Sequence, residues 1–154
     1  MTVIEPTPTL GGSARAHRGG TSPRTSSYQD FDSGLAVRTV ESAGHTRAAV
    51  AGELDLATAP TAGDILTDCL VLSPAGLDVD LGDVAFFDCA GLNMLLRLRA
   101  RALDLGVELA ISALSPSVAR VLDLSGTREL FASPTRTCEA RVVRPARPAR
   151  ASQP

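Results

Sequence analysis

The chain has 154 residues, which is enough for one domain and little more. Apolar residues make up 44% of it but aromatic residues only 3%, so a core must be built mainly from Leu, Val, Ala and Ile. Residues 31–143 carry fifteen acidic residues against nine arginines, a net charge of −6. Because phosphate binding requires a basic face, this charge makes nucleic acid a poor main partner.

The three cysteines, Cys69, Cys89 and Cys138, are odd in number and show no CxxC spacing. This pattern argues against a disulfide framework or a zinc site and fits a reducing compartment. No apolar run approaches the ~18 residues of a membrane span, and no apolar segment follows basic residues at the N-terminus as in a signal peptide. We therefore expect a cytoplasmic protein without membrane insertion.

The two ends differ in composition from the middle of the chain. Residues 1–30 are rich in Gly, Ser, Thr, Pro and Arg, and residues 144–154 are rich in Arg and Pro. Such segments bury too little surface to offset the roughly 1–2 kcal/mol per residue that ordering costs. The sequence therefore predicts a disordered N-terminal arm at 1–30, one domain at 31–143 and a disordered tail at 144–154.

A β-hairpin and a helix open the predicted domain. Alternating apolar and polar residues predict strands at 35–40 and 47–54, and Ser-Ala-Gly at 42–44 predicts the turn between them. A helix then begins at Thr58, a candidate N-cap, and ends before the Pro and Gly of 74–76. Its apolar positions recur at i, i+3, i+4 and i+7, which predicts one buried face: Ala62, Ile65, Leu66 and Cys69.

A second unit of strand and helix follows. Apolar residues that alternate with aspartates predict a short strand at 77–81, and a loop is expected at 82–87. A helix then starts at Ala90 or Gly91 and stops at Gly106. Its core-facing residues are expected to be Leu92, Leu95, Leu96, Ala102 and Leu103.

The last predicted elements are a strand at 108–111 and a helix that begins at Ser115 and ends at Gly126. Residues 136–143 could form a strand or a short helix, and their pattern does not decide. Helices that alternate with strands imply right-handed crossovers between parallel strands. The predicted fold class is therefore α/β, with a mixed, mostly parallel sheet of four to five strands and helices packed against it.

Four local motifs occur in order at the junctions of these elements. They are Gly52-Glu53-Leu54-Asp55 with Thr58-Ala59; Asp80-Leu81 with Val84 and Phe86-Phe87-Asp88; Gly91-Leu92; and Ser115-Pro116-Ser117-Val118 with Leu122, Ser125-Gly126 and Phe131. One such motif is weak evidence, whereas four in the right order are specific. Over residues 35–133 the chain resembles the STAS family of anti-sigma factor antagonists.

The resemblance implies a regulator that binds an anti-sigma factor, often itself a serine kinase, and so releases a sigma factor. Separately, the residue inventory disfavours catalysis and a bound cofactor, since the chain has only two histidines and its globular part has no GxSxG, GxGxxG or GxxxxGK[ST] motif. In the family, the kinase phosphorylates a Ser or Thr in a D-S-S/T-G-L segment at the start of the second helix, which breaks the complex. Here the segment reads Asp88-Cys89-Ala90-Gly91-Leu92, so Ala90 occupies the phosphoacceptor position and cannot be phosphorylated.

Three hypotheses follow from this departure. The chain could be a constitutive antagonist, always competent to bind. It could be regulated in another way, or have diverged toward a different partner. Cys89 could be a redox switch, because a thiol at a helix N-terminus can have a lowered pKa, although Asp88 opposes this and a small filler in a tight turn is the simpler interpretation.

The resemblance places the partner-binding surface at the start of the second helix, with Asp88 and Gly91, and in the Gly-Glu-Leu-Asp loop before the first helix, with Glu53 and Asp55. Farther along the helix, Met94 and Leu98 lie off the predicted core stripe, beside Arg97 and Arg101. Met and Arg are enriched at interfaces, so we expect a half-exposed strip here. The alternative is that the two apolar residues pack under the loop at 82–87.

Other functions find little support in the residues present. Asp55 and Asp88 could act as an acid/base pair but are better explained as loop and helix caps, and Asp78 with Asp80 lacks a third ligand for a cation. No metal site is predicted. The runner-up is a STAS subunit that docks on the ATPase of an ABC-type transporter; a small hydrolase ranks third, and a homodimer is left open.

Overall fold

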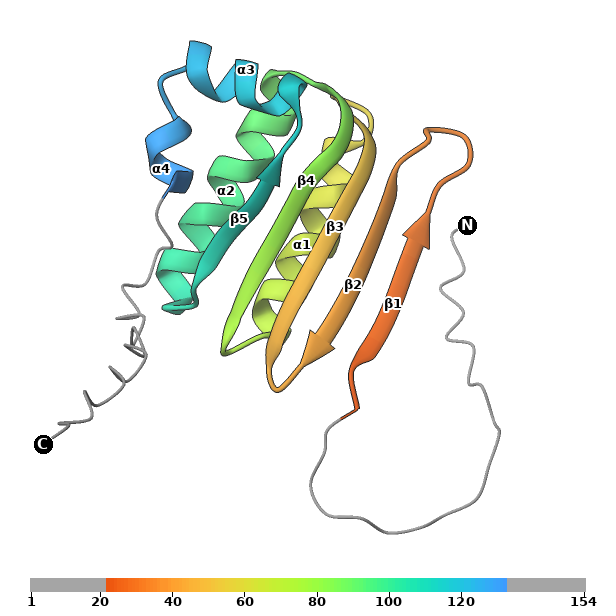
Figure 1. Ribbon diagram of the computed structural model, residues 1–154, viewed down its shortest axis with the longest axis vertical. Helices are drawn as coiled ribbons and strands as arrows, with labels where there is room; N and C mark the ends of the chain where they lie inside the picture. The colour runs from red at the N-terminus through yellow and green to blue at the C-terminus, as the bar shows by residue number, and fades with distance from the viewer. Residues whose placement is uncertain (1–21, 133–154) are drawn as a thin grey trace, which may run out of the picture.

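The computed structural model describes residues 22–132. Within them, five strands and four helices follow one another as β1 Arg24–Gln29, β2 Ala36–Ser42, β3 His45–Leu54, α1 Ala59–Leu72, β4 Gly76–Phe87, α2 Cys89–Leu105, β5 Leu109–Leu114, α3 Pro116–Leu124 and α4 Arg128–Ala132. The strands form one sheet in the order β1-β2-β3-β4-β5 (Figure 1). The first three strands are antiparallel, and β3, β4 and β5 are parallel, which confirms the predicted α/β fold with a mixed sheet.

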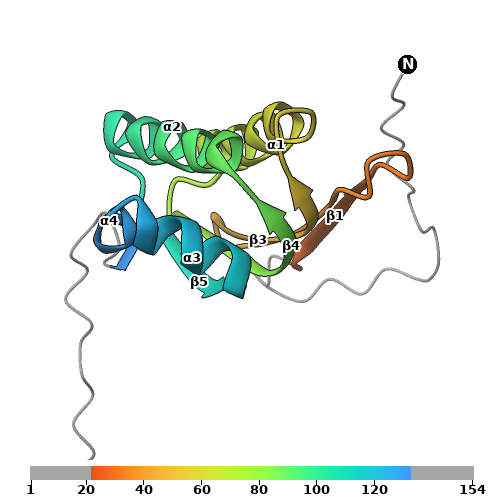
Figure 2. The ribbon, with the colours of Figure 1, turned by 90° about the horizontal axis from the view of Figure 1, so that it is seen from above.

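Both parallel crossovers place their helices on the same face of the sheet, so α1 and α2 lie side by side (Figure 2). This follows from the right-handed rule, because β4 and β5 are added in the same direction across the sheet. The core lies between these helices and the sheet, and α3 and α4 lie beside β5 and α2. The sheet and helices α1, α2 and α3 all contribute fully buried side chains, among them Val37, Val50, Leu54, Leu66, Leu70, Val79, Leu81, Leu95, Leu98 and Leu122.

The predicted hairpin turn is confirmed. Ser42 pairs with His45, which leaves Ala43 and Gly44 as a two-residue loop with positive φ angles of 52° and 78°. Two successive positive φ angles are typical of the tight turns that match the twist of a hairpin, and glycine adopts them without strain.

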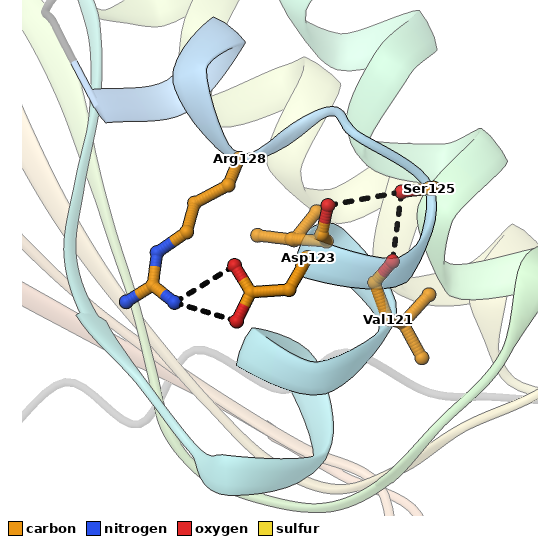
Figure 3. Close-up of polar contacts among 5 residues, drawn as sticks. Val121, Asp123, Ser125 and Arg128 are labelled. Atoms are coloured by element: carbon orange, nitrogen blue, oxygen red, sulfur yellow. Dashed lines mark hydrogen bonds and ion pairs between the residues drawn. The ribbon is translucent and has the colours of Figure 1, made fainter.

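The turn between α3 and α4 is held by polar contacts of the Ser125-Gly126 motif (Figure 3). Ser125 Oγ donates to the Val121 carbonyl at 2.7 Å, and Gly126 has a φ of 68°. Arg128 then pairs with the carboxylate of Asp123 at 2.8 Å. The short helix α4 that follows this turn was not predicted from the sequence.

The prediction of a disordered arm at 1–30 is wrong for residues 24–29, which form β1 along the free edge of β2. The β1–β2 connection is closed by the Asp30 N–H, which donates to the Leu35 carbonyl at 2.9 Å. Only Tyr28 of β1 packs against the core, so backbone pairing stabilises the strand rather than apolar burial, and composition gave no sign of it. Residues 1–21, 136–143 and 144–154 lie outside the described residues.

The predicted loop at 82–87 is also wrong, because β4 continues through it to Phe87. The pairing with β3 shifts register twice in this region, between Ala49 and Ala51 and between Gly52 and Glu53. The strand consequently buries every third residue there, at Leu81, Val84 and Phe87, instead of every second. That spacing differs from the two-residue period of a regular strand, so the sequence pattern alone does not predict a strand here.

The buried face of α2 is rotated from the predicted one. Leu95 and Ala102 are buried as expected, but Leu103 is 51% exposed, and Leu92 and Leu96 are only partly buried. The helix packs against α1 as well as the sheet, so its buried face is broader toward α1. Its buried residues are Gly91, Met94, Leu95, Leu98 and Ala102.

Candidate functional site

The loop between β3 and α1 is built around one carboxylate and one hydroxyl. Asp55 Oδ1 accepts hydrogen bonds from the N–H groups of Ala57 at 2.9 Å and Thr58 at 3.0 Å. Thr58 Oγ1 donates to the Glu53 carbonyl at 2.6 Å and accepts from the Asp55 N–H at 3.0 Å. Thr58 occupies the N-cap position of α1, but its side chain caps no N–H of the helix and instead closes the preceding loop.

These hydrogen bonds favour the ionised form of the Asp55 carboxylate. The N–H of Thr58 is the main cause that holds the pKa of Asp55 below its ordinary value, and the Ala57 N–H and the Thr58 hydroxyl lower it further. Together they outweigh burial, which acts in the opposite direction. Asp55 is therefore ionised at neutral pH. The prediction that it is a loop-capping residue is confirmed.

The N-terminus of α2 is capped by Asp88. Its Oδ1 accepts from the N–H of Ala90 at 2.8 Å and from the N–H of Gly91 at 3.4 Å, and its own N–H donates to the Leu54 carbonyl at 3.4 Å. The last bond ties the start of α2 to the end of β3. The expected N-cap role of Asp88 is confirmed, and the two loops named by the resemblance lie side by side.

Gly91 is required by packing. A Cβ on Gly91 would lie 2.6 and 2.8 Å from two ring carbons of Phe87 and 3.2 Å from the Leu54 carbonyl oxygen. The first turn of α2 therefore sits directly on the Phe87 ring, and the preceding Ala90 is held in a fixed place. Gly91 itself is buried, so it positions the predicted binding surface and is not part of it.

The exposed surface around the start of α2 contains predicted site residues and two further residues that the sequence analysis did not select. Glu53 and Cys89 are exposed and Ala90 is partly buried. Leu56 is 82% exposed in the β3–α1 loop, and Phe86 is 47% exposed on the strand end that pairs with Glu53. Leu56 is a large apolar residue among the polar residues of its loop, which is the signal that could have identified it. The expected loop at 82–87 obscured the strand position of Phe86.

A groove of about 490 Å³ runs between α1 and α2 from this surface. Its lining includes five of the predicted residues, Ala90, Met94, Arg97, Leu98 and Arg101. The lining also includes residues that the sequence reasoning did not select, which are Asn93 on α2 and, on the opposite side, Leu56, Ala59, Pro60, Gly63, Asp64 and Thr67.

Met94 and Leu98 form the floor of the groove. They are only 6% and 2% exposed, so the prediction of a half-exposed strip is wrong for both. They lie between the two helices rather than under residues 82–87, and a Cβ on Gly63 would come within 3.0 Å of Met94 Cγ. The small residue on α1 is what lets Met94 lie flat between the helices.

Arg97 and Arg101, by contrast, are exposed as predicted. The ion pairs within residues 22–132 join Arg47 to Asp80 and Arg128 to Asp123, so neither groove arginine takes part in one. The α2 side of the groove therefore carries two unpaired positive charges one helical turn apart.

The remaining candidate carboxylates, Asp78 and Asp80, lie on strand β4. Asp80 accepts from the Gly82 N–H at 2.9 Å and lies 3.6 Å from Arg47, whereas Asp78 Oδ1 is buried without a hydrogen-bond partner among the described residues. In residues 22–132, no three His, Cys, Asp or Glu side chains gather as a metal site would require. None of the helices between residues 22 and 132 has the length and apolar character needed to cross a bilayer.

Comparison with known proteins agrees with this architecture. The STAS domain family model matches residues 36–142, well over half of the chain. The chain is similar to the crystal structure of an anti-sigma factor antagonist from Mycobacterium paratuberculosis, with 25% identity and a TM-score of 0.58 over 68% of this chain and 88% of that one. A second similar structure is the anti-sigma factor antagonist SpoIIAA in its unphosphorylated form, with 17% identity and a TM-score of 0.47 over 54% and 73% of the two chains. The motifs, the fold and the family match agree, and the chain belongs to the STAS domain family.

Proposed function

We propose that this STAS domain is an anti-sigma factor antagonist, which binds an anti-sigma factor in the cytoplasm and thereby frees a sigma factor. The similarity to the Mycobacterium paratuberculosis antagonist supports this role, since it extends over most of that protein. The observation that carries the proposal is the capped and closely packed start of α2, which is partly exposed. Asp88 caps the helix, the absence of a Cβ on Gly91 lets the first turn pack against the Phe87 ring, and Ala90 lines the end of the groove.

The same geometry supports a constitutive antagonist. A phosphate would add a charge of about −1.5 to −2 at the α2 N-terminus, beside the carboxylates of Asp88 and Asp55. Ala90 offers no hydroxyl to carry it, and Cys89 beside it offers only a thiol. A partner of the serine-kinase type would therefore bind this chain without releasing it by phosphorylation at this position.

The two carboxylates of the site support binding rather than catalysis. A general base at neutral pH needs a pKa near the working pH, whereas the hydrogen bonds of Asp55 lower its pKa. Asp88 also accepts two backbone N–H groups, which is the geometry of a helix cap. Both side chains are engaged in positioning backbone, and neither is free to serve as an acid/base group.

A pull-down separates this proposal from its alternatives. The full chain, Ala90→Asp and Ala100→Asp serve as baits in an ATP-supplemented lysate of the source organism. Ala100 is exposed on α2 outside the groove lining, so A100D carries the same added charge at a position away from the proposed binding surface. We expect the parent chain and A100D to retain an anti-sigma factor that A90D loses.

Two results would contradict the proposal. Recovery of a transporter ATPase by the parent chain would favour the runner-up role as a transporter subunit. Equal recovery of one anti-sigma factor by all three baits would mean that the α2 N-terminus is not the binding surface.

A further inference from the structure

The groove between α1 and α2 continues well beyond the α2 N-terminus. Its lining on α2 extends from Ala90 to Arg101, which is about 16 Å or three turns of helix. Buried Met94 and Leu98 form an apolar floor, and exposed Leu56 stands at the end near Ala90. An occupant must therefore present a continuous apolar stripe over about three turns.

The rim of the groove on α2 is positively charged against the trend of the domain. Residues 22–132 carry fifteen acidic residues and eight arginines, a net charge of −7, yet Arg97 and Arg101 project together without an acidic partner among these residues. Like charges at i and i+4 destabilise a helix by roughly 0.2–0.5 kcal/mol. An anionic partner would remove this repulsion.

The opposite rim differs, which gives the groove an orientation. On α1 the one charged residue of the lining is Asp64, which is exposed and is followed one turn later by Thr67. An occupant with acidic residues on both flanks would be repelled by Asp64. The complementary occupant has acidic residues on one flank only, the one that faces α2.

We propose that this groove binds an amphipathic helix of the partner, about three turns long, with Leu- or Ile-type residues on the floor and acidic residues facing Arg97 and Arg101. The inference rests on the proposed function for the identity of the partner. The partner would bind in a helix-in-groove mode, in which the apolar anchor residues of the bound helix recur at i, i+3, i+4 and i+7. Met94 suits such a floor because its side chain adapts to the anchors.

The first test uses the anti-sigma factor identified in the pull-down, purified, with the double variant Arg97→Glu/Arg101→Glu. Arg120→Glu is the matched control, since Arg120 is exposed on α3 and outside the groove. We expect the double variant to lower the affinity by roughly tenfold or more and R120E to leave it unchanged. Equal thermal midpoints for the three proteins establish that all are folded.

The second test does not depend on that partner. Two synthetic amphipathic peptides of about eleven residues carry the same leucine stripe, one with glutamates on the flank that faces α2 and one with arginines there. In NMR titrations of the full chain, we expect the glutamate peptide to shift the amide resonances of groove residues and to bind more tightly than the arginine peptide. With R97E/R101E this preference should reverse.

The outcomes separate the two proposals. Loss of anti-sigma factor binding by A90D but not by R97E/R101E would leave the proposed function standing and overturn the groove occupant. A peptide preference that does not reverse with the double variant would overturn it as well. If the parent chain is a dimer in sedimentation and R97E/R101E dissociates that dimer, the occupant of the groove is a second copy of the chain. That result would also refute the proposed occupant.

Discussion

Replacement of Gly91 by alanine tests the central packing feature of the site. The added Cβ would lie 2.6 and 2.8 Å from Phe87 ring carbons, whereas carbon atoms in contact are about 3.5–4.0 Å apart, so the ring must move by ~1 Å. Phe87 is only 5% exposed, so the ring must move within a packed interior. Overpacking of this kind costs typically about 1–3 kcal/mol.

The gain in helix propensity opposes this cost. Glycine is roughly 0.5–1 kcal/mol less favourable than alanine in the middle of a helix, and Gly91 lies in the first turn of α2, so we take a gain of about 0.5 kcal/mol. The net loss in the free energy of unfolding should then be about 0.5–2.5 kcal/mol. For a domain of this size, that corresponds to a fall in Tm of roughly 2–10 °C, measured by thermal unfolding followed by circular dichroism. Partner affinity should fall as well, because the α2 N-terminus shifts.

Gly63→Ala is the matched control, since it adds the same group to the neighbouring helix. There the closest atom is Met94 Cγ at 3.0 Å, part of a flexible side chain, so the Tm should stay near that of the parent or rise. A Tm for G91A equal to or above that of the parent chain would refute the claim that close packing requires glycine at position 91.

Three further predictions follow from the site. Ala90→Ser restores a hydroxyl at the phosphoacceptor position, so a serine-kinase partner with ATP should phosphorylate the variant at Ser and release it. The parent chain should stay bound and show no phosphate in mass spectrometry. ATP-dependent release of the parent chain would contradict a constitutive antagonist. Asp88→Ala removes the acceptor of two N–H groups of α2 and should lower the free energy of unfolding, measured in urea, by about 0.5–2 kcal/mol. Asp88→Ser keeps an oxygen that can cap the helix and should recover most of this loss. Equal effects of the two variants would argue against capping. The pKa of Asp55 is lowered by folding, so its stabilising effect is present above the unfolded value of about 3.9 and is lost as the pH falls through the folded value. The Tm difference between the parent and Asp55→Asn should therefore be largest near neutral pH and vanish in acid, and a difference that grows in acid would be inconsistent with this sign.

The sequence predicted the elements whose signals are local. Two positive φ angles at Ala43 and Gly44 close the β2–β3 turn, the αL glycine Gly106 ends α2, and Ser115 caps α3 through its bond to the Val118 N–H. Each of these depends on the chemistry of a few neighbouring residues. For the same reason, the capping roles of Asp55 and Asp88 could be foreseen.

The errors occurred where long-range pairing overrides local pattern. β1 exists because β2 offers an unpaired edge, and its own side chains are mostly exposed. β4 keeps its pairing through two register shifts, which break the alternation on which strand prediction depends. The buried face of α2 depends on α1 as a neighbour, and the many leucines of α2 make more than one face plausible from sequence alone.

The candidate site divides in the same way. Sequence motifs alone determined the family resemblance, the capped start of α2 and the absence of a hydroxyl at Ala90, because these are properties of residue type and order. Only the tertiary structure decided that Met94 and Leu98 are a buried floor, that Leu56 and Phe86 are exposed, and that Arg97 and Arg101 border a groove. These properties depend on how α1 and α2 pack side by side, which is set by contacts between segments far apart in the chain.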